Sequence, residues 1–111
     1  MRLAWIVLLA ACGSRPALTF APEKLGDATV GQPYHATVTI SGGETPVGGI
    51  TAVALPPGLT LTYDERRDTG IASIDGTPTA AGRTSLTVDA WCYGTNRPGQ
   101  TGKHVYELVV H

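Results

Sequence analysis

Apolar and polar residues alternate in three stretches of the chain. Every second residue is apolar between Pro33 and Ile40, and the same alternation returns at 86–93 and 105–110. A period of two residues is typical of a β-strand with one buried face. The pattern therefore predicts these core-facing positions: Tyr34, Ala36, Val38 and Ile40 in the first stretch, Leu86, Val88, Ala90 and Cys92 in the second, and Tyr106, Leu108 and Val110 in the third.

Four shorter apolar stretches complete a set of about seven predicted strands. They cover Leu18–Phe20, Ile50–Val53, Leu59–Tyr63 and Ile71–Ile74, with Gly and Pro between them. After the first twelve residues, Gly or Pro interrupts every window in which an amphipathic helix of about ten residues would fit. We therefore predict an all-β fold, an immunoglobulin-like Greek-key β-sandwich.

The start of the chain predicts export. Arg2 supplies a positive charge, Leu3–Leu9 is an unbroken apolar run, and two alanines precede Cys12. This is the order of regions in a secretory signal peptide. The run is too short to cross a bilayer as a helix, which takes about 20 residues. We predict a signal peptide over residues 1–11, a short linker over 12–17 and the sandwich over 18–111.

The sequence Leu9-Ala10-Ala11-Cys12 resembles the lipobox of bacterial lipoproteins. The resemblance implies that Cys12 becomes the first residue of the mature chain and carries covalent lipid on its thiol and its amine. Two or three acyl chains anchor a protein stably, whereas a single chain does not. The resemblance also implies a place in the cell envelope, and Gly13 favours the outer membrane in a Gram-negative cell. The alternative is ordinary secretion with Cys12 unmodified or removed.

Several turns carry a second resemblance. Leu55–Leu61 (LPPGLTL) and Ile74–Gly82 (IDGTPTAAG) are similar to segments of the Ig-like domains of bacterial surface proteins, which are related to the cadherin-like domain of dystroglycan. The similarity covers roughly Gly31–Ala90. Independently of it, Pro56-Pro57 must interrupt a sheet, and Gly58 can supply the positive φ that turns the chain back.

The chain departs from that family in two places. Val47-Gly48-Gly49-Ile50 stands where the family usually has an aromatic pair, so we expect a strand that is kinked or poorly packed. The loop from Asp64 to Gly70 is longer and more charged than usual.

Composition excludes some functions. The chain has 111 residues, a formal net charge of −1 and 15% charged residues, which allows one domain and provides no positive field for a nucleic-acid backbone. It has neither a phosphate-binding loop nor a Gly-x-Ser-x-Gly motif. We therefore predict that it is not an enzyme.

Trp91 and Tyr93 are the strongest candidates for a ligand-binding site. They lie two residues apart on the face opposite the predicted core, next to the loop from Gly94 to Gly102. Exposed aromatic side chains can stack on sugar rings or on peptide side chains. The alternative is that the loop folds back and covers both rings.

A weaker candidate is a calcium site at Asp64, Glu65 and Asp68. Calcium takes six or more oxygen ligands, often from acidic loops. Arg66 and Arg67 cancel most of the charge, which makes an ordinary solvated hairpin tip the alternative. Cys92 is predicted to be a buried small hydrophobic residue, and a disulfide with Cys12 is the alternative if that residue is not lipidated.

These observations predict a membrane-anchored envelope lipoprotein with a non-catalytic binding, adhesion or structural module. The alternatives are a carbohydrate-binding module that uses Trp91 and Tyr93, and a calcium-dependent cadherin-like adhesion domain. A partner would be an envelope protein or polysaccharide. The final strand, Lys103–His111, is predicted to be a sheet edge to which another strand can add.

Overall fold

The computed structural model describes residues 17–67 and 69–111. The predicted signal peptide, Cys12 and Asp68 lie outside the described residues. Within these ranges the chain forms seven β-strands and no helix: β1 (Thr19–Ala21), β2 (Tyr34–Ser41), β3 (Val47–Val53), β4 (Leu59–Thr62), β5 (Ile71–Gly76), β6 (Gly82–Cys92) and β7 (Thr101–Val110). No helix in this described part is long and apolar enough to cross a membrane. The predicted all-β class is confirmed.

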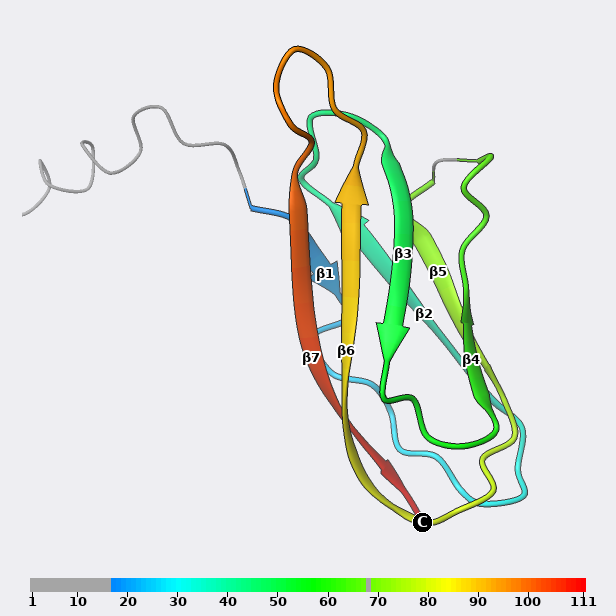
Figure 1. Cartoon of the computed structure of the whole chain (residues 1–111). Helices are drawn as coiled ribbons and strands as arrows, with labels where there is room; N and C mark the ends of the chain where they lie inside the picture. The colour runs from blue at the N-terminus through cyan, green and yellow to red at the C-terminus, as the bar shows by residue number, and fades with distance from the viewer. Residues whose placement is uncertain (1–16, 68) are drawn as a thin grey trace, which may run out of the picture.

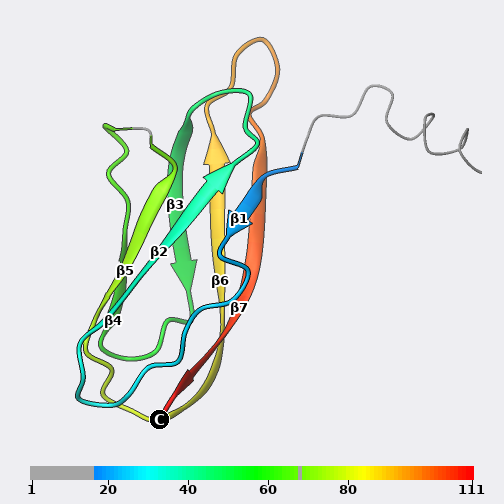
Figure 2. The same cartoon turned by 180° about the vertical axis from the view of Figure 1, so that it is seen from behind.

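The strands form two antiparallel sheets that pack face to face (Figures 1 and 2). One sheet has the order β1-β2-β5-β4, and the other has the order β3-β6-β7. This is the seven-strand arrangement of constant-type Ig domains, in which the first, second, fifth and fourth strands form one sheet and the remaining three form the other. The predicted Ig-like sandwich is therefore also confirmed.

The core lies between the two sheets, and the alternating positions fill it. Val38 and Ile40 of β2 are buried, as are the predicted core residues of β6 and β7. Burial of this apolar surface is the main favourable term in folding. The fully buried side chains of largest volume are Tyr106, Ile74, Leu86, Leu108, Val38, Val88 and Pro78.

Strand β3 is kinked at its glycine pair, as its sequence predicts. The register against β6 shifts between Val47 and Gly49, which marks a β-bulge. The strand is not poorly packed, because Val47 and Ile50 on either side of the bulge are both buried. It also begins at Val47, earlier than the apolar pattern from Ile50 onward indicates.

The connection from β3 to β4 has the predicted turn. Gly58 has a φ of +95°, and the backbone N–H of Leu59 donates to the Pro56 carbonyl at 3.1 Å. The turn returns the chain to the sandwich, and Leu59 is buried in the core.

The segment between β1 and β2 crosses from one sheet to the outer edge of the other. Ala28 forms an isolated parallel bridge with Val110: its N–H donates to the Val109 carbonyl, and its carbonyl accepts from the N–H of His111, both at 2.8 Å. The hydroxyl of Tyr106 donates to the Pro22 carbonyl at 2.7 Å. These bonds attach the segment to β7.

Candidate binding surface

The two candidate aromatic residues lie at the end of β6, on the outer face of the β3-β6-β7 sheet. Trp91 is 45% exposed and Tyr93 is 42% exposed. The neighbouring core-facing residue Cys92 is buried, as predicted. The loop that follows β6 therefore leaves both rings open to solvent.

The indole of Trp91 lies on the glycine pair of β3. A Cβ added to Gly48 would lie 2.2 Å from Cζ3 of the ring, and one added to Gly49 would lie 2.3 Å from Nε1. Both distances are far below van der Waals contact, so the ring fills the space that side chains at these positions would need. The glycine pair, where the family usually has aromatic residues, thus provides the seat for Trp91.

Tyr93 meets Trp91 edge to face. The two ring centroids lie 5.4 Å apart with an interplanar angle of 86°, a preferred geometry for an aromatic pair. The backbone of Tyr93 is held by the β2–β3 loop, because its N–H donates to the Pro46 carbonyl at 3.1 Å and its carbonyl accepts from Oγ1 of Thr45 at 2.6 Å. These two hydrogen bonds hold the backbone of Tyr93 in place beside the indole.

Polar groups flank the indole along the sheet. In the register of the sheet, Gly49, Trp91 and Thr101 form one row, and Thr51, Asp89 and Lys103 form the next row on the same sheet face. An open cavity of about 340 Å³ lies beside the ring. Its lining consists of Asp89, Ala90, Trp91, Thr101, Gly102 and Lys103. The site therefore combines an apolar ring with a carboxylate, a hydroxyl and an ammonium group, which suits a small ligand with both apolar and polar groups.

A buried amide connects the two loops above this surface. Gln100 is 7% exposed; its Oε1 accepts from the N–H of Glu44 at 2.8 Å, and its Nε2 donates to the Gly42 carbonyl at 3.4 Å. Arg97 adds an ion pair with Glu44 at 3.5 Å. The sequence does not single out Gln100, because one amide in a Gly/Pro-rich loop carries no pattern.

In the acidic loop, the Asp64 carboxylate is paired with the two arginines of the same loop. Asp64 forms ion pairs with Nε of Arg66 and Nε of Arg67, each at 3.5 Å. Among the residues that the structure describes, no group of three His, Cys, Asp or Glu side chains could hold a metal ion. Glu65 is exposed, and Asp68 lies outside the described residues.

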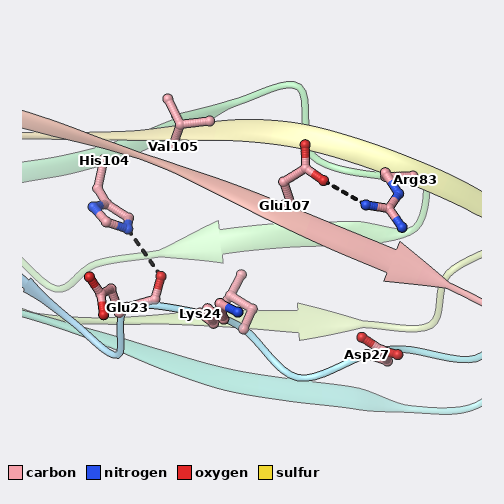
Figure 3. Close-up of a pocket in the computed structure, with 8 residues that line it drawn as sticks. Glu23, Lys24, Asp27, Arg83, His104, Val105 and Glu107 are labelled. Carbon is pink, nitrogen blue, oxygen red and sulfur yellow. Dashed lines mark hydrogen bonds and ion pairs between the residues drawn. The ribbon is translucent and has the colours of Figure 1, made fainter.

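A second cavity, of about 550 Å³, lies between β7 and the segment Glu23–Asp27 (Figure 3). His104 reaches across it, with Nε2 3.1 Å from the Glu23 carbonyl. On the outer face of the sheet, Glu107 accepts from Arg83 Nη1 at 3.0 Å and from Ser85 Oγ at 3.1 Å. These two hydrogen bonds lower the pKa of Glu107. The cavity is lined by Glu23, Lys24, Leu25, Asp27, Arg83, His104, Val105 and Glu107.

Comparison with known proteins shows the fold. No protein-family model matches the chain, and no curated protein matches it, so the more specific family resemblance of its turns remains a prediction. Among solved structures, the SrpA adhesin of Streptococcus sanguinis is similar with a TM-score of 0.64 and 13% identity, over 88% of this chain and 57% of the adhesin chain.

Two titin structures are also similar. The titin M3 domain gives a TM-score of 0.56 at 15% identity, over 88% of this chain and 99% of that domain. A chimeric titin Z1Z2 gives 0.54 at 18% identity, over 88% and 98%. At these identities the likeness establishes an Ig-like fold, which many unrelated functions share.

Proposed function

We propose that this chain is a non-catalytic binding module of the cell envelope, which is held at a membrane by lipid on Cys12 and binds its ligand at the surface around Trp91 and Tyr93. The observation that carries the proposal is the seat of Trp91: the indole lies on two glycines of β3 and keeps 45% of its surface exposed.

The glycine seat has an energetic cost. Glycine within a strand is destabilising by roughly 0.5–1 kcal/mol relative to alanine, and β3 has two such residues side by side. A larger residue at either position would displace the indole. The arrangement therefore gives up some stability and leaves a large apolar ring in solvent, as expected for a surface that a ligand covers.

A saccharide is the ligand class that this surface fits best. One face of a sugar ring is rich in C–H groups and can stack on an indole, while its hydroxyls can bond with neighbouring polar side chains. Asp89 and Lys103 line the cavity beside Trp91 and can accept and donate such bonds. An envelope polysaccharide is therefore the proposed partner.

Binding to a glycan array tests this proposal. We expect the full chain to bind a subset of envelope polysaccharides and the Trp91→Ala variant to lose that binding. Val53→Ala is the matched control, because Val53 is 58% exposed on the same sheet face but away from Trp91. Binding that Trp91→Ala retains, or no binding to any polysaccharide, would contradict the saccharide assignment.

The membrane tether rests on the sequence around Cys12. Strand β1 begins at Thr19, so a lipid on Cys12 would hold the sandwich close to the bilayer, and Gly13 favours the outer membrane. Mass spectrometry of the membrane fraction should find an acylated Cys12 as the first residue. Cys12→Ala should move the protein to the soluble fraction, whereas an unmodified, soluble wild-type protein would contradict the tether.

A further inference from the structure

We propose that β7 is the contact strand of a symmetric dimer, in which two copies of this chain pair their β7 edges in antiparallel fashion with Val105 on the two-fold axis. This interaction does not involve Trp91 itself, although Lys103 also lines the cavity beside that ring. It would join the two β3-β6-β7 sheets into one continuous sheet across the pair.

Three of the four sheet edges are unsuited to pairing with another strand. Strand β1 has 3 residues and β4 has 4, and β3 contains the bulge. Short strands and bulges are the devices by which proteins block their sheet edges. In contrast, β7 has 10 residues, and its register against β6 is continuous from Val110 to Thr101.

The outer edge of β7 presents backbone groups to a partner. The Val109 carbonyl and the His111 N–H bond to Ala28, so the odd-numbered residues direct their backbone groups away from β6. Because this direction alternates along an antiparallel strand, the groups of Lys103, Val105 and Glu107 face the same edge. In the described part of the chain, β6 is the only strand that pairs with β7, and Ala28 bonds to the outer edge at Val109 and His111.

Space is available along this edge. The two ends of the segment Glu23–Asp27 contact His104 and His111. Between these contacts, a cavity of about 550 Å³, lined in part by Val105 and Glu107, separates the segment from the strand (Figure 3). The figure shows Val105 and Glu107 pointing away from that segment, while His104 points toward it. Val105 is 57% exposed, and a second copy would cover it.

The charges of β7 select a second copy and fix one register. With Val105 opposite Val105 of the second copy, Lys103 lies opposite Glu107 of the second copy, and the pair occurs twice by symmetry. A shift by two residues places each charge opposite an uncharged residue. A shift by four places Lys103 opposite Lys103, or Glu107 opposite Glu107. Opposite charges that face each other stabilise strand pairing, and like charges destabilise it.

The existing partners of Glu107 leave room for this contact. Arg83 and Ser85 donate to its two oxygens from β6, and an ionised carboxylate has about four acceptor positions. A lysine on an edge strand ordinarily discourages pairing. Here each lysine would meet a carboxylate in only one register, so the lysine makes the pairing specific.

Co-purification of two differently tagged full-length copies from detergent-solubilised membranes tests the dimer. We expect wild-type copies to co-purify. When both copies carry Lys103→Glu, or both carry Glu107→Lys, co-purification should fall to background. In either case two like charges face each other at both cross-strand positions. One copy of each variant should restore co-purification, because both cross-strand pairs become attractive again. That rescue also shows that both variants are folded.

A second comparison uses two valines of the same sheet face. Val105→Lys places two lysines on the two-fold axis and should abolish co-purification. Val53→Lys, at a residue 58% exposed on the opposite edge, should leave it unchanged. Three results would each overturn the proposal. Wild-type copies could fail to co-purify, the two charge variants could fail to rescue each other when mixed, or all variants could co-purify equally well. Glu107, Val105 and Val53 lie outside the lining of the cavity beside Trp91, so the results for the variants at these three positions do not depend on whether a polysaccharide binds there.

Discussion

Trp91 and Gly49 lie opposite each other on β6 and β3, and a Cβ on Gly49 would come within 2.3 Å of the indole nitrogen. The position of the exposed ring therefore depends on the absence of a side chain on the neighbouring strand. The candidate binding surface consists of both strands rather than of two aromatic residues alone.

The first prediction concerns that seat. Gly49→Ala should displace the indole, weaken saccharide binding, and destabilise the fold by about 1–3 kcal/mol, because the added methyl group overpacks the site. Trp91 is the only tryptophan after the predicted signal peptide, so a change in tryptophan emission of the mature protein reports the displacement. Gly26→Ala is the control, since a Cβ there has no atom within 4 Å. Emission and binding unchanged in Gly49→Ala would contradict the seat.

The second prediction concerns the bond between Tyr106 and Pro22. Tyr106 is 1% exposed, and its hydroxyl holds the segment after β1 against β7. Tyr106→Phe keeps the packing of the ring and removes the bond, which should lower the free energy of unfolding by about 0.5–1.5 kcal/mol. Urea denaturation measures the loss, and an unchanged unfolding midpoint would show that the bond does not stabilise the fold.

The third prediction concerns pH. Hydrogen bonds from Arg83 and Ser85 lower the pKa of Glu107 in the folded state. A carboxyl group whose folded pKa is lowered stabilises the fold above its ordinary pKa, and this contribution is lost as the pH falls through the folded value. Arg83→Gln should therefore be less stable than wild type at neutral pH, and the difference should narrow below about pH 4. Urea denaturation of both proteins at neutral pH and below about pH 4 measures this difference in the free energy of unfolding. A difference that stays constant with pH would contradict the role assigned to Glu107.

Most of the fold could be predicted from the sequence, because its strands carry strong alternation. The apolar positions of β6 and β7 identified their core faces directly. Prediction was weaker where side chains are small or absent. The start of β3 lies at Val47-Gly48-Gly49, and glycine contributes nothing to an apolar pattern.

The candidate site was only partly predictable. The outward direction of Trp91 follows from the period of β6, but its seat does not, because the contact joins residues about forty positions apart. The same holds for the attachment of the segment after β1. His104 meets the Glu23 carbonyl, and His111 Nε2 lies 2.8 Å from Asp27 Oδ2. Neither pair has a sequence spacing that would indicate it.

Hydroxyl-radical footprinting of Trp91 and Tyr93 in intact envelopes tests the central claim most directly, because it detects an occupied surface whatever the ligand is. Ile71, which is 47% exposed on β5 of the other sheet, serves as the reference. We predict that both aromatic residues are oxidised less in the envelope than in the purified protein, while the oxidation of Ile71 is unchanged. Equal oxidation of Trp91 and Tyr93 in the two samples would contradict the claim that this surface binds an envelope component.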